Sequence, residues 1–170
     1  MANELAALEA RLGRLEDLDA VRSTWLDYCT RLDLGDVDGL RDVFTETAQL
    51  EVNGLAEAFD GVYHGRDSIL NDMYLRTGFP MRAGAQPRNM TGHLSTNMQI
   101  DLDGDLATTL AYFFEIVDDL VLIGTYQHRM RRDPDRWRIA FLRISIRYRA
   151  RIEAHDVAGQ ALATIAAKPT

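Results

Sequence analysis

The stretch "DLDGDLATTLAYFFEIVDDLVLIGTYQHRMRRDPDRW", residues 101–137, determines the fold class of this chain. Its two long runs are rich in β-branched and aromatic residues, and they are bounded by the clusters "DLDGD", "DD" and "DPD". Such clusters form tight turns, which join antiparallel strands. We therefore predict an antiparallel meander of four long strands, over residues 89–102, 106–117, 120–132 and 137–152.

The first part of the chain is predicted to be helical. Apolar side chains recur there at helical spacing and form one stripe, made of Leu18, Val21, Trp25, Tyr28 and Leu32. This stripe indicates a helix over residues 4–32, with Gly13 as a candidate break. Asp36 is a suitable N-cap for a second, short helix over residues 36–44.

Residues 48–53 and 57–65 are predicted strands, and residues 66–78 a further amphipathic helix. Helices followed by a meander indicate an α+β domain in which a curved sheet wraps the helices. We expect one domain over residues 1–170, with its core at about residues 10–152 and a terminal helix or tail at 153–170.

The composition argues against several classes of partner. With 46% hydrophobic and 26% charged residues, the chain is typical of a globular protein, and its net charge of −7 disfavours nucleic acid and anionic membranes. No apolar run approaches the length of a membrane span. Cys29 is the single cysteine, so no intrachain disulfide forms, which fits a reducing cytoplasm. We expect a cytoplasmic protein without metal or cofactor.

The predicted strand over residues 106–117 is apolar on both faces. One face can pack on the helices, whereas the other needs a different cover. We therefore expect a homo-oligomer, either a dimer or a trimer.

His93, in "NMTGHLSTNMQI" (residues 89–100), is the first candidate functional residue. In a regular strand His93, Ser95, Asn97 and Gln99 share one face. The simple interpretation is a solvent-facing row of polar side chains, and the functional one is a histidine that does chemistry.

Asp33 lies in or after the last helical turn, where a carboxylate opposes the helix dipole. It is therefore either a residue of an ordinary turn or a functional acid beside a buried face. Tyr28, on the other edge of the stripe, is equally typical of core packing. Glu115 interrupts an apolar strand, and Arg143 or Arg147 could pair with it in a structural ion pair.

Four stretches of the chain carry a resemblance to a known family: "YCTRLDLGDVDGLRDVFTETAQLEV", "GVYHGRDSI", "TGHLSTNMQIDLDGDLATTLAYF" and "GTYQHRMRRDPDRWRIAFLRI". They resemble the SnoaL-like branch of the nuclear transport factor 2-like superfamily, which includes scytalone dehydratase, bile-acid 7α-dehydratase and polyketide cyclases. The resemblance implies a cone-shaped α+β barrel, with the N-terminal helices packed in the concave face of a curved, mostly antiparallel sheet.

The dehydratases of this family place a tyrosine and an aspartate near the end of the first long helix, and a histidine at the start of a strand. Tyr28, Asp33 and His93 stand at the matching positions. The resemblance therefore implies an Asp33–His93 dyad that removes a carbon-bound proton, with Tyr28 as the donor to an oxygen. Scytalone itself is not an expected substrate, because the tyrosine that precedes the aspartate in that enzyme is Leu32 here.

The interior of such a cone is expected to favour an apolar, cyclic ligand. The candidate substrate contacts are Trp25, Phe44, Met98, Tyr112 or Phe113, and Tyr126, together with Asn97, Glu115 and Arg147.

Three functions fit these patterns. The first is a cofactor-free lyase, isomerase or cyclase acting on a hydrophobic, cyclic small molecule through Asp33 and His93. The second is a non-catalytic module of the same fold that binds a small molecule or a protein. The third is an accessory subunit resembling the small subunit of ring-hydroxylating dioxygenases.

Overall fold

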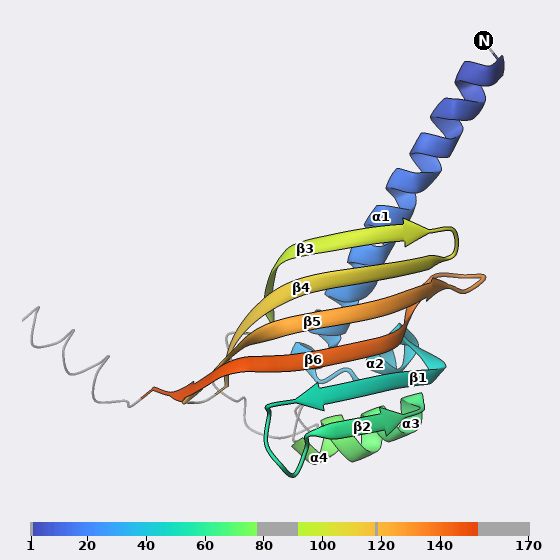
Figure 1. Ribbon diagram of the computed structural model, residues 1–170. Helices are drawn as coiled ribbons and strands as arrows, with labels where there is room; N and C mark the ends of the chain where they lie inside the picture. Colours follow the sequence, from blue (N-terminus) through green and yellow to red (C-terminus); the bar gives the residue numbers. More distant parts are fainter. Residues whose placement is uncertain (1, 78–91, 118, 153–170) are drawn as a thin grey trace, which may run out of the picture.

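The computed structural model describes residues 2–77, 92–117 and 119–152, which form one six-stranded sheet with helices over one face (Figure 1). In chain order the elements are α1 (Ala2–Leu34), α2 (Val37–Val43), β1 (Phe44–Asn53), β2 (Gly61–His64), α3 (Arg66–Ser68), the π-helical turn η1 (Ile69–Tyr74), α4 (Leu75–Thr77), β3 (Leu94–Asp103), β4 (Leu106–Val117), β5 (Leu120–Arg132) and β6 (Trp137–Arg151).

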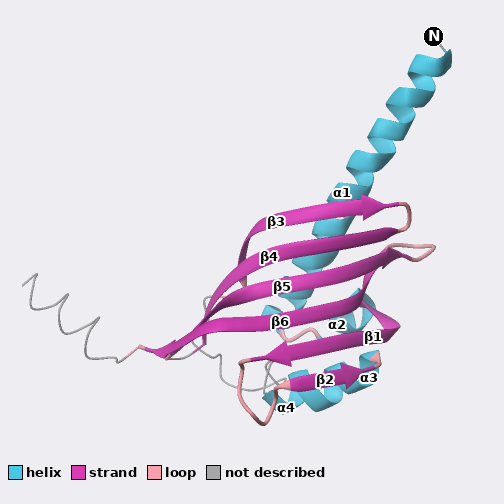
Figure 2. Cartoon of the chain, viewed as in Figure 1, coloured by secondary structure: helices cyan, strands magenta, loops and turns pink. Residues whose placement is uncertain are grey.

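The four C-terminal strands form the predicted meander. The strand order is β2-β1-β6-β5-β4-β3, and each neighbouring pair is antiparallel except β1 and β6. The sheet is open, with β2 and β3 as its edges, and the helices cover one face (Figure 2). The α+β class, with helices packed against a curved, mostly antiparallel sheet, is confirmed.

The C-terminal half of α1 is anchored in the core. Its buried side chains are Val21, Thr24, Trp25, Tyr28, Cys29 and Leu32, so the predicted stripe faces the sheet as expected. The helix ends at Leu34, and Asp36 then caps α2 by accepting a hydrogen bond from the backbone N–H of Gly39. These two helices set the position of Asp33 relative to the sheet.

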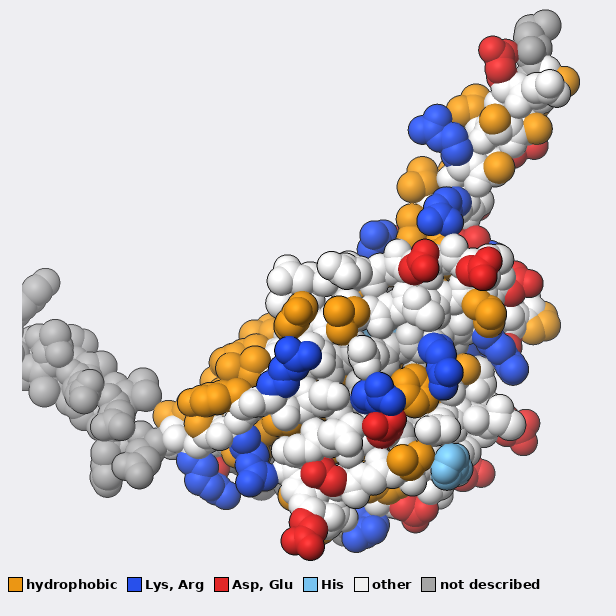
Figure 3. Space-filling view, viewed as in Figure 1, with side chains coloured by type: hydrophobic (Ala, Val, Ile, Leu, Met, Phe, Trp, Pro, Cys, Tyr) orange, Lys and Arg blue, Asp and Glu red, His pale blue; other side chains and the backbone are white. Residues whose placement is uncertain are grey.

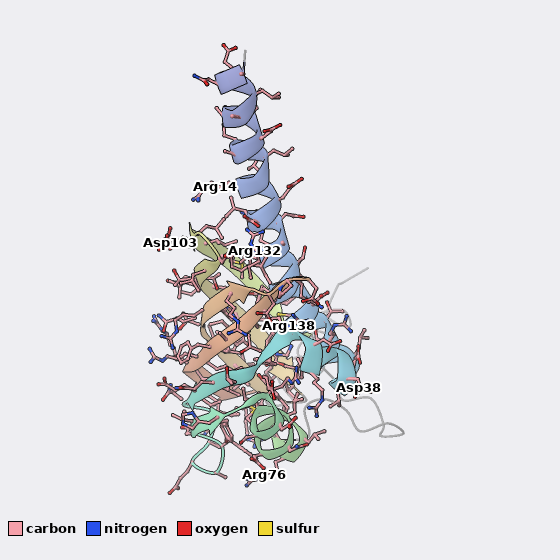
Figure 4. All side chains as sticks on the ribbon, turned by 90° about the vertical axis from the view of Figure 1, so that its right-hand side faces the viewer. Arg14, Asp38, Arg76, Asp103, Arg132 and Arg138 are labelled. Atoms are coloured by element: carbon pink, nitrogen blue, oxygen red, sulfur yellow. The ribbon has the colours of Figure 1, made fainter. Side chains whose placement is uncertain are left out.

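The N-terminal half of α1 projects beyond the sheet (Figure 1). Figure 4 shows Arg14 on this projecting part, and Arg132 of β5 lower down, where it pairs with Asp17 of α1. The predicted break at Gly13 is wrong, because the helix is continuous through it and a glycine inside a helix costs only about 1 kcal/mol relative to alanine. Within the described ranges, no helix combines the length and the apolar character needed to cross a membrane.

The short elements differ from the prediction mainly at their ends. Strand β1 begins at Phe44, four residues earlier than expected, and β2 is limited to Gly61–His64. The predicted helix over 66–78 is observed to Thr77, and its middle is the π-helical turn that buries Met73 and Tyr74. The expected tail at 153–170, and residues 89–91 of the predicted strand, lie outside the described residues.

A bulge in β3 changes which of its side chains face the helices. Leu94 pairs with Phe114 of β4, but the register shifts by one residue between Thr96 and Gln99, and Asn97 has a positive φ of 54°. Beyond the bulge the even-numbered Met98, Ile100 and Leu102 pack against the core. Before it the odd-numbered residues face inward, because an extra residue reverses the alternation. His93, which immediately precedes the strand, is therefore directed inward.

The outer face of the sheet is apolar at one end. Figure 3 shows hydrophobic side chains gathered there over the strands, and the exposed ones are Leu94, Tyr112, Ile123 and Tyr148. The pairings Leu94–Phe114, Phe114–Ile123 and Ile123–Tyr148 bring them together across four strands. Self-association through this face stays a prediction.

Candidate active site

Asp33 and His93 are brought together from the end of α1 and the start of β3. Asp33 Oδ1 lies 2.5 Å from His93 Nδ1, and Asp33 Oδ2 accepts a hydrogen bond of 3.0 Å from the backbone N–H of His93. The same carboxylate thus holds both the ring and the main chain of the histidine. Because an ionised carboxylate only accepts hydrogen bonds, Nδ1–H donates to Asp33, and in the neutral imidazole the lone pair is then on Nε2.

Gly92 allows this close contact. It has a positive φ of 76°, and a Cβ added to it would lie 2.8 Å from Asp33 Oδ2. A larger residue would therefore meet both a strained backbone and the carboxylate oxygen. A glycine at position 92 thus leaves the space that the carboxylate of Asp33 needs to approach the backbone.

The imidazole of His93 is buried between two acids. Its side chain is 3% exposed, and Nε2 lies 3.7 Å from Glu115 Oε1, whose side chain is 5% exposed. Burial alone would lower the pKa of His93, but the hydrogen bond that His93 donates to Asp33 and the charges of Glu115 and Asp33 outweigh it, so that the pKa is raised. Burial, together with the charge of Asp33, also raises the pKa of Glu115.

Two tyrosines, Tyr28 and Tyr74, line the same cavity as His93. Tyr28 and Tyr74 share a hydrogen bond of 2.7 Å, and the rings of Tyr28 and His93 are 6.3 Å apart in an edge-on arrangement. Burial raises the pKa of Tyr28, and that of Tyr74 as well, so both hydroxyls are protonated at neutral pH. A protonated phenol can donate a hydrogen bond to an oxygen atom.

These groups border one cavity, with a volume of about 50 Å³. That volume is far below the several hundred Å³ of a typical ligand pocket, so it fits the reacting end of a small molecule. The lining is mainly apolar, with polar atoms converging at one side. It consists of Tyr28, Leu32, Val52, Leu55, Met73, Tyr74, His93, Phe113, Glu115, Leu122, Tyr126, Ile144 and Ile146.

Several predicted substrate contacts lie behind this cavity. Trp25 and Phe44 are buried and touch the ring of Tyr28, at centroid distances of 4.9 and 6.0 Å, without lining the cavity. Tyr126 lines it and packs on Phe113, which is 4.3 Å away between ring centroids. Of the two alternatives that the sequence left open, Phe113 faces inward and Tyr112 does not.

Three further predicted contacts need correction, because their side chains are exposed to solvent and lie outside the cavity. Asn97 is exposed in the bulge, Tyr112 is 44% exposed on the outer face, and Arg147 is exposed on β6. The predicted ion pair of Glu115 with Arg143 or Arg147 is also wrong. Arg143 instead bonds Glu51 at 2.8 Å, on the outer face.

The sequence reasoning missed Tyr74 and Gly92 as site residues. Tyr74 was recognisable only as a buried position of an amphipathic helix, and its contact with Tyr28 is long-range. Gly92 could have been noticed in the sequence, because it directly precedes the candidate histidine. Over the described ranges, no three acidic, histidine or cysteine side chains are arranged to hold a metal ion.

The chain belongs to the SnoaL-like domain family, whose model matches residues 13–143. No curated protein matches the sequence. The family assignment therefore rests on the domain model together with the fold.

Solved structures share this fold at low sequence identity. A nuclear transport factor 2-like protein with a cystatin-like fold from Novosphingobium aromaticivorans is 23% identical, with a TM-score of 0.66, 93% of this chain covered and 96% of that one. A protein from the same organism with a provisional scytalone dehydratase name is 17% identical, with a TM-score of 0.66 and coverages of 83% and 91%. The type 2 hexachlorocyclohexane dehydrochlorinase LinA is 14% identical, with a TM-score of 0.67 and coverages of 85% and 94%.

Proposed function

We propose that this protein is a cofactor-free lyase, isomerase or cyclase that acts on a hydrophobic, cyclic small molecule. The observation that carries the proposal is the contact of 2.5 Å between Asp33 Oδ1 and His93 Nδ1 beside an apolar cavity. A buried histidine that is held by a carboxylate through one nitrogen can act as a base through the other.

The first chemical step is the removal of a proton from carbon. Nε2 of His93 takes a proton from a carbon next to a carbonyl group, and Asp33 stabilises the imidazolium that forms. Tyr28, which shares a hydrogen bond with Tyr74, donates a hydrogen bond to the carbonyl oxygen as negative charge develops on it. Elimination, double-bond isomerisation and ring closure can all continue from this enolate.

The names of two structural neighbours support an elimination. One is a dehydrochlorinase, and another carries a provisional dehydratase name. Both names describe the loss of a small group from a neighbouring carbon. At these identities the likeness shows the fold alone, so the chemistry is argued from Asp33, His93 and Tyr28.

The test compares wild type with His93→Ala and with His64→Ala, which changes an exposed histidine on β2. Cyclic ketones are incubated in deuterated water, and exchange of the hydrogens next to the carbonyl group is followed by NMR. We expect His93→Ala to lower the exchange rate by about 10²–10⁴-fold, as is usual for loss of a general base, and His64→Ala to leave it unchanged.

Thermal-shift measurements on both variants distinguish catalysis from binding. If His93→Ala binds cyclic ligands as the wild type does and wild-type protein catalyses no exchange, the protein is a binding module. Equal exchange rates in wild type and His93→Ala would contradict the role of the histidine.

A further inference from the structure

Glu115 is a buried acid that the mechanism above does not use. Leu94 pairs with Phe114, so His93 and Glu115 lie opposite each other on neighbouring antiparallel strands, with both side chains on the inner face. Glu115 Oε1 is buried, and it has no hydrogen-bond partner among the described residues. Among the described residues, its ionisable neighbour is His93, whose Nε2 lies 3.7 Å away.

An ion pair with an arginine does not account for Glu115. A separation of 3.7 Å is too long for a hydrogen bond, and the two arginines that could have neutralised the carboxylate lie elsewhere. Leaving a buried polar atom without a partner costs free energy, so such an atom in a cavity is a candidate for function. Glu115 and His93 both line the cavity, where a substrate can lie against both side chains.

We propose that Glu115 is the acid that protonates the leaving group, and that the substrate is therefore a β-hydroxy ketone or aldehyde that loses water. This inference rests on the proposed function, because it needs His93 as the base. It narrows the reaction to an elimination and the substrate to compounds whose leaving oxygen must accept a proton.

The step is balanced in atoms and electrons. Nε2 of His93 takes the proton from the carbon next to the carbonyl group, and the electron pair of that C–H bond forms the new C=C bond. The C–O bond breaks, and the departing oxygen takes the proton of Glu115 and leaves as water. The imidazolium of His93 then returns its proton to the Glu115 carboxylate, which lies 3.7 Å away, so that both groups are restored.

The surroundings of Glu115 raise its pKa. Burial is the largest cause, and the negative charge of Asp33 adds to it, while a positive charge on His93 opposes them. Cys29, Tyr74 and Tyr126 also interact with Glu115, and all three are protonated at neutral pH because burial raises their pKa values. The raised pKa of Glu115 is in the direction that a proton donor requires.

Substrates that differ only in their leaving group can distinguish the role of the acid from that of the base. Hydroxide is a poor leaving group and needs a proton, whereas chloride leaves without one. We would compare 3-hydroxycyclohexanone with 3-chlorocyclohexanone, both of which give the same cyclohexenone, using wild type and Glu115→Gln. Glu46→Gln, on the exposed part of β1, is the matched control.

We expect Glu115→Gln to lower kcat/KM for the hydroxy compound about 10²-fold or more, which is typical of a lost general acid, and to change that for the chloro compound less than about threefold. Deuterium exchange next to the carbonyl group should persist. Equal effects on both compounds, or none on the hydroxy compound, would overturn the inference while leaving the base in place. Wild type that neither eliminates nor exchanges would overturn the proposed function, and the inference with it.

A second measurement needs no substrate. Infrared difference spectra of wild type minus Glu115→Gln at pH 7 should contain the C=O band of a protonated carboxyl group, and wild type minus Glu46→Gln should not. A difference spectrum with only carboxylate bands for Glu115 would refute its role as the acid, whatever the turnover data show.

Discussion

Two buried histidines lie on the inner face of the same sheet, and their surroundings differ. His93 Nδ1 and His128 Nδ1 each make a hydrogen bond of 2.5 Å, the first to Asp33 and the second to Thr109. The pKa of His93 is raised, whereas burial lowers the pKa of His128 to about 3. The ring of His128 is packed against Trp25, at 4.4 Å between centroids, in the closed part of the core.

The difference shows that the charge of the partner, and not burial alone, sets the proton affinity of a buried histidine. Both rings lie opposite an inward-facing residue of β4, because Thr109 pairs with His128 and His93 extends the β3–β4 register opposite Glu115. A hydroxyl partner leaves the penalty of burying charge uncompensated, while two carboxyl groups offset it. Strand β4 thus faces a structural histidine, His128, at one place and a candidate catalytic one, His93, at another.

Asp33→Asn should reduce the difference in pKa between His93 and His128. Of the changes considered, it has the largest expected effect on turnover. The amide keeps the shape but loses the charge, so the pKa of His93 falls toward that of His128. We expect turnover or exchange to fall about 10²–10⁴-fold with little loss of stability. NMR titration of the imidazole checks the pKa, and an unchanged pKa would contradict the electrostatic role of Asp33.

His93 and His128 should change the free energy of unfolding in opposite directions as the pH is lowered. Below pH 6.5 the unfolded chain protonates His128 while the folded protein does not until about pH 3, so stability falls by about 1.4 kcal/mol per pH unit, or about 2 kcal/mol by pH 5. The raised pKa of His93 stabilises the fold below its ordinary pKa, and this contribution is lost as the pH rises through the raised value.

Urea unfolding of wild type and His128→Gln between pH 5 and 7 measures these slopes. The glutamine can accept the hydrogen bond of Thr109 but does not titrate, so the loss of stability toward low pH should be reduced in this variant. A slope in His128→Gln that is as steep as in the wild type would show that other groups cause it.

Gly92→Ala should disturb the His93 region by a smaller amount. The added Cβ would lie 2.8 Å from Asp33 Oδ2, at a backbone φ of 76°. We expect a loss of stability of about 1–3 kcal/mol and slower exchange. Gly104→Ala is the control, because Gly104 also has a positive φ, of 58°, but a Cβ there meets nothing within 4 Å. Equal effects of the two changes on exchange would argue against a special fit between Gly92 and Asp33.

Local patterns predicted much of the fold. The turn clusters located the meander, and the stripe from Val21 to Leu32 located the buried half of α1. Asp36 was predictable as a cap, because capping depends on a few neighbouring residues. The pairing of α1 with the start of β3 came only from the family resemblance, since 60 residues separate Asp33 from His93.

The bulge at Asn97 accounts for what the sequence could not predict. Asparagine tolerates a positive φ, but nothing in "LSTNMQ" marks an extra residue, and regular alternation therefore gave Asn97 and His93 the same face. The register of β3 on β4 depends on contacts across the sheet. For that reason Glu115 was expected to pair with an arginine instead of facing His93.

The buried thiol of Cys29 can serve as a probe of local opening of the fold. It is the only cysteine, it is 5% exposed, and burial raises the pKa of its thiol, so alkylating reagents cannot reach a reactive thiolate in the closed protein. The alkylation rate therefore reports how often the C-terminal half of α1 separates from the sheet. The neighbouring Tyr28 borders the cavity, so a ligand that binds there should lower the rate of Cys29 alkylation without contacting the sulfur.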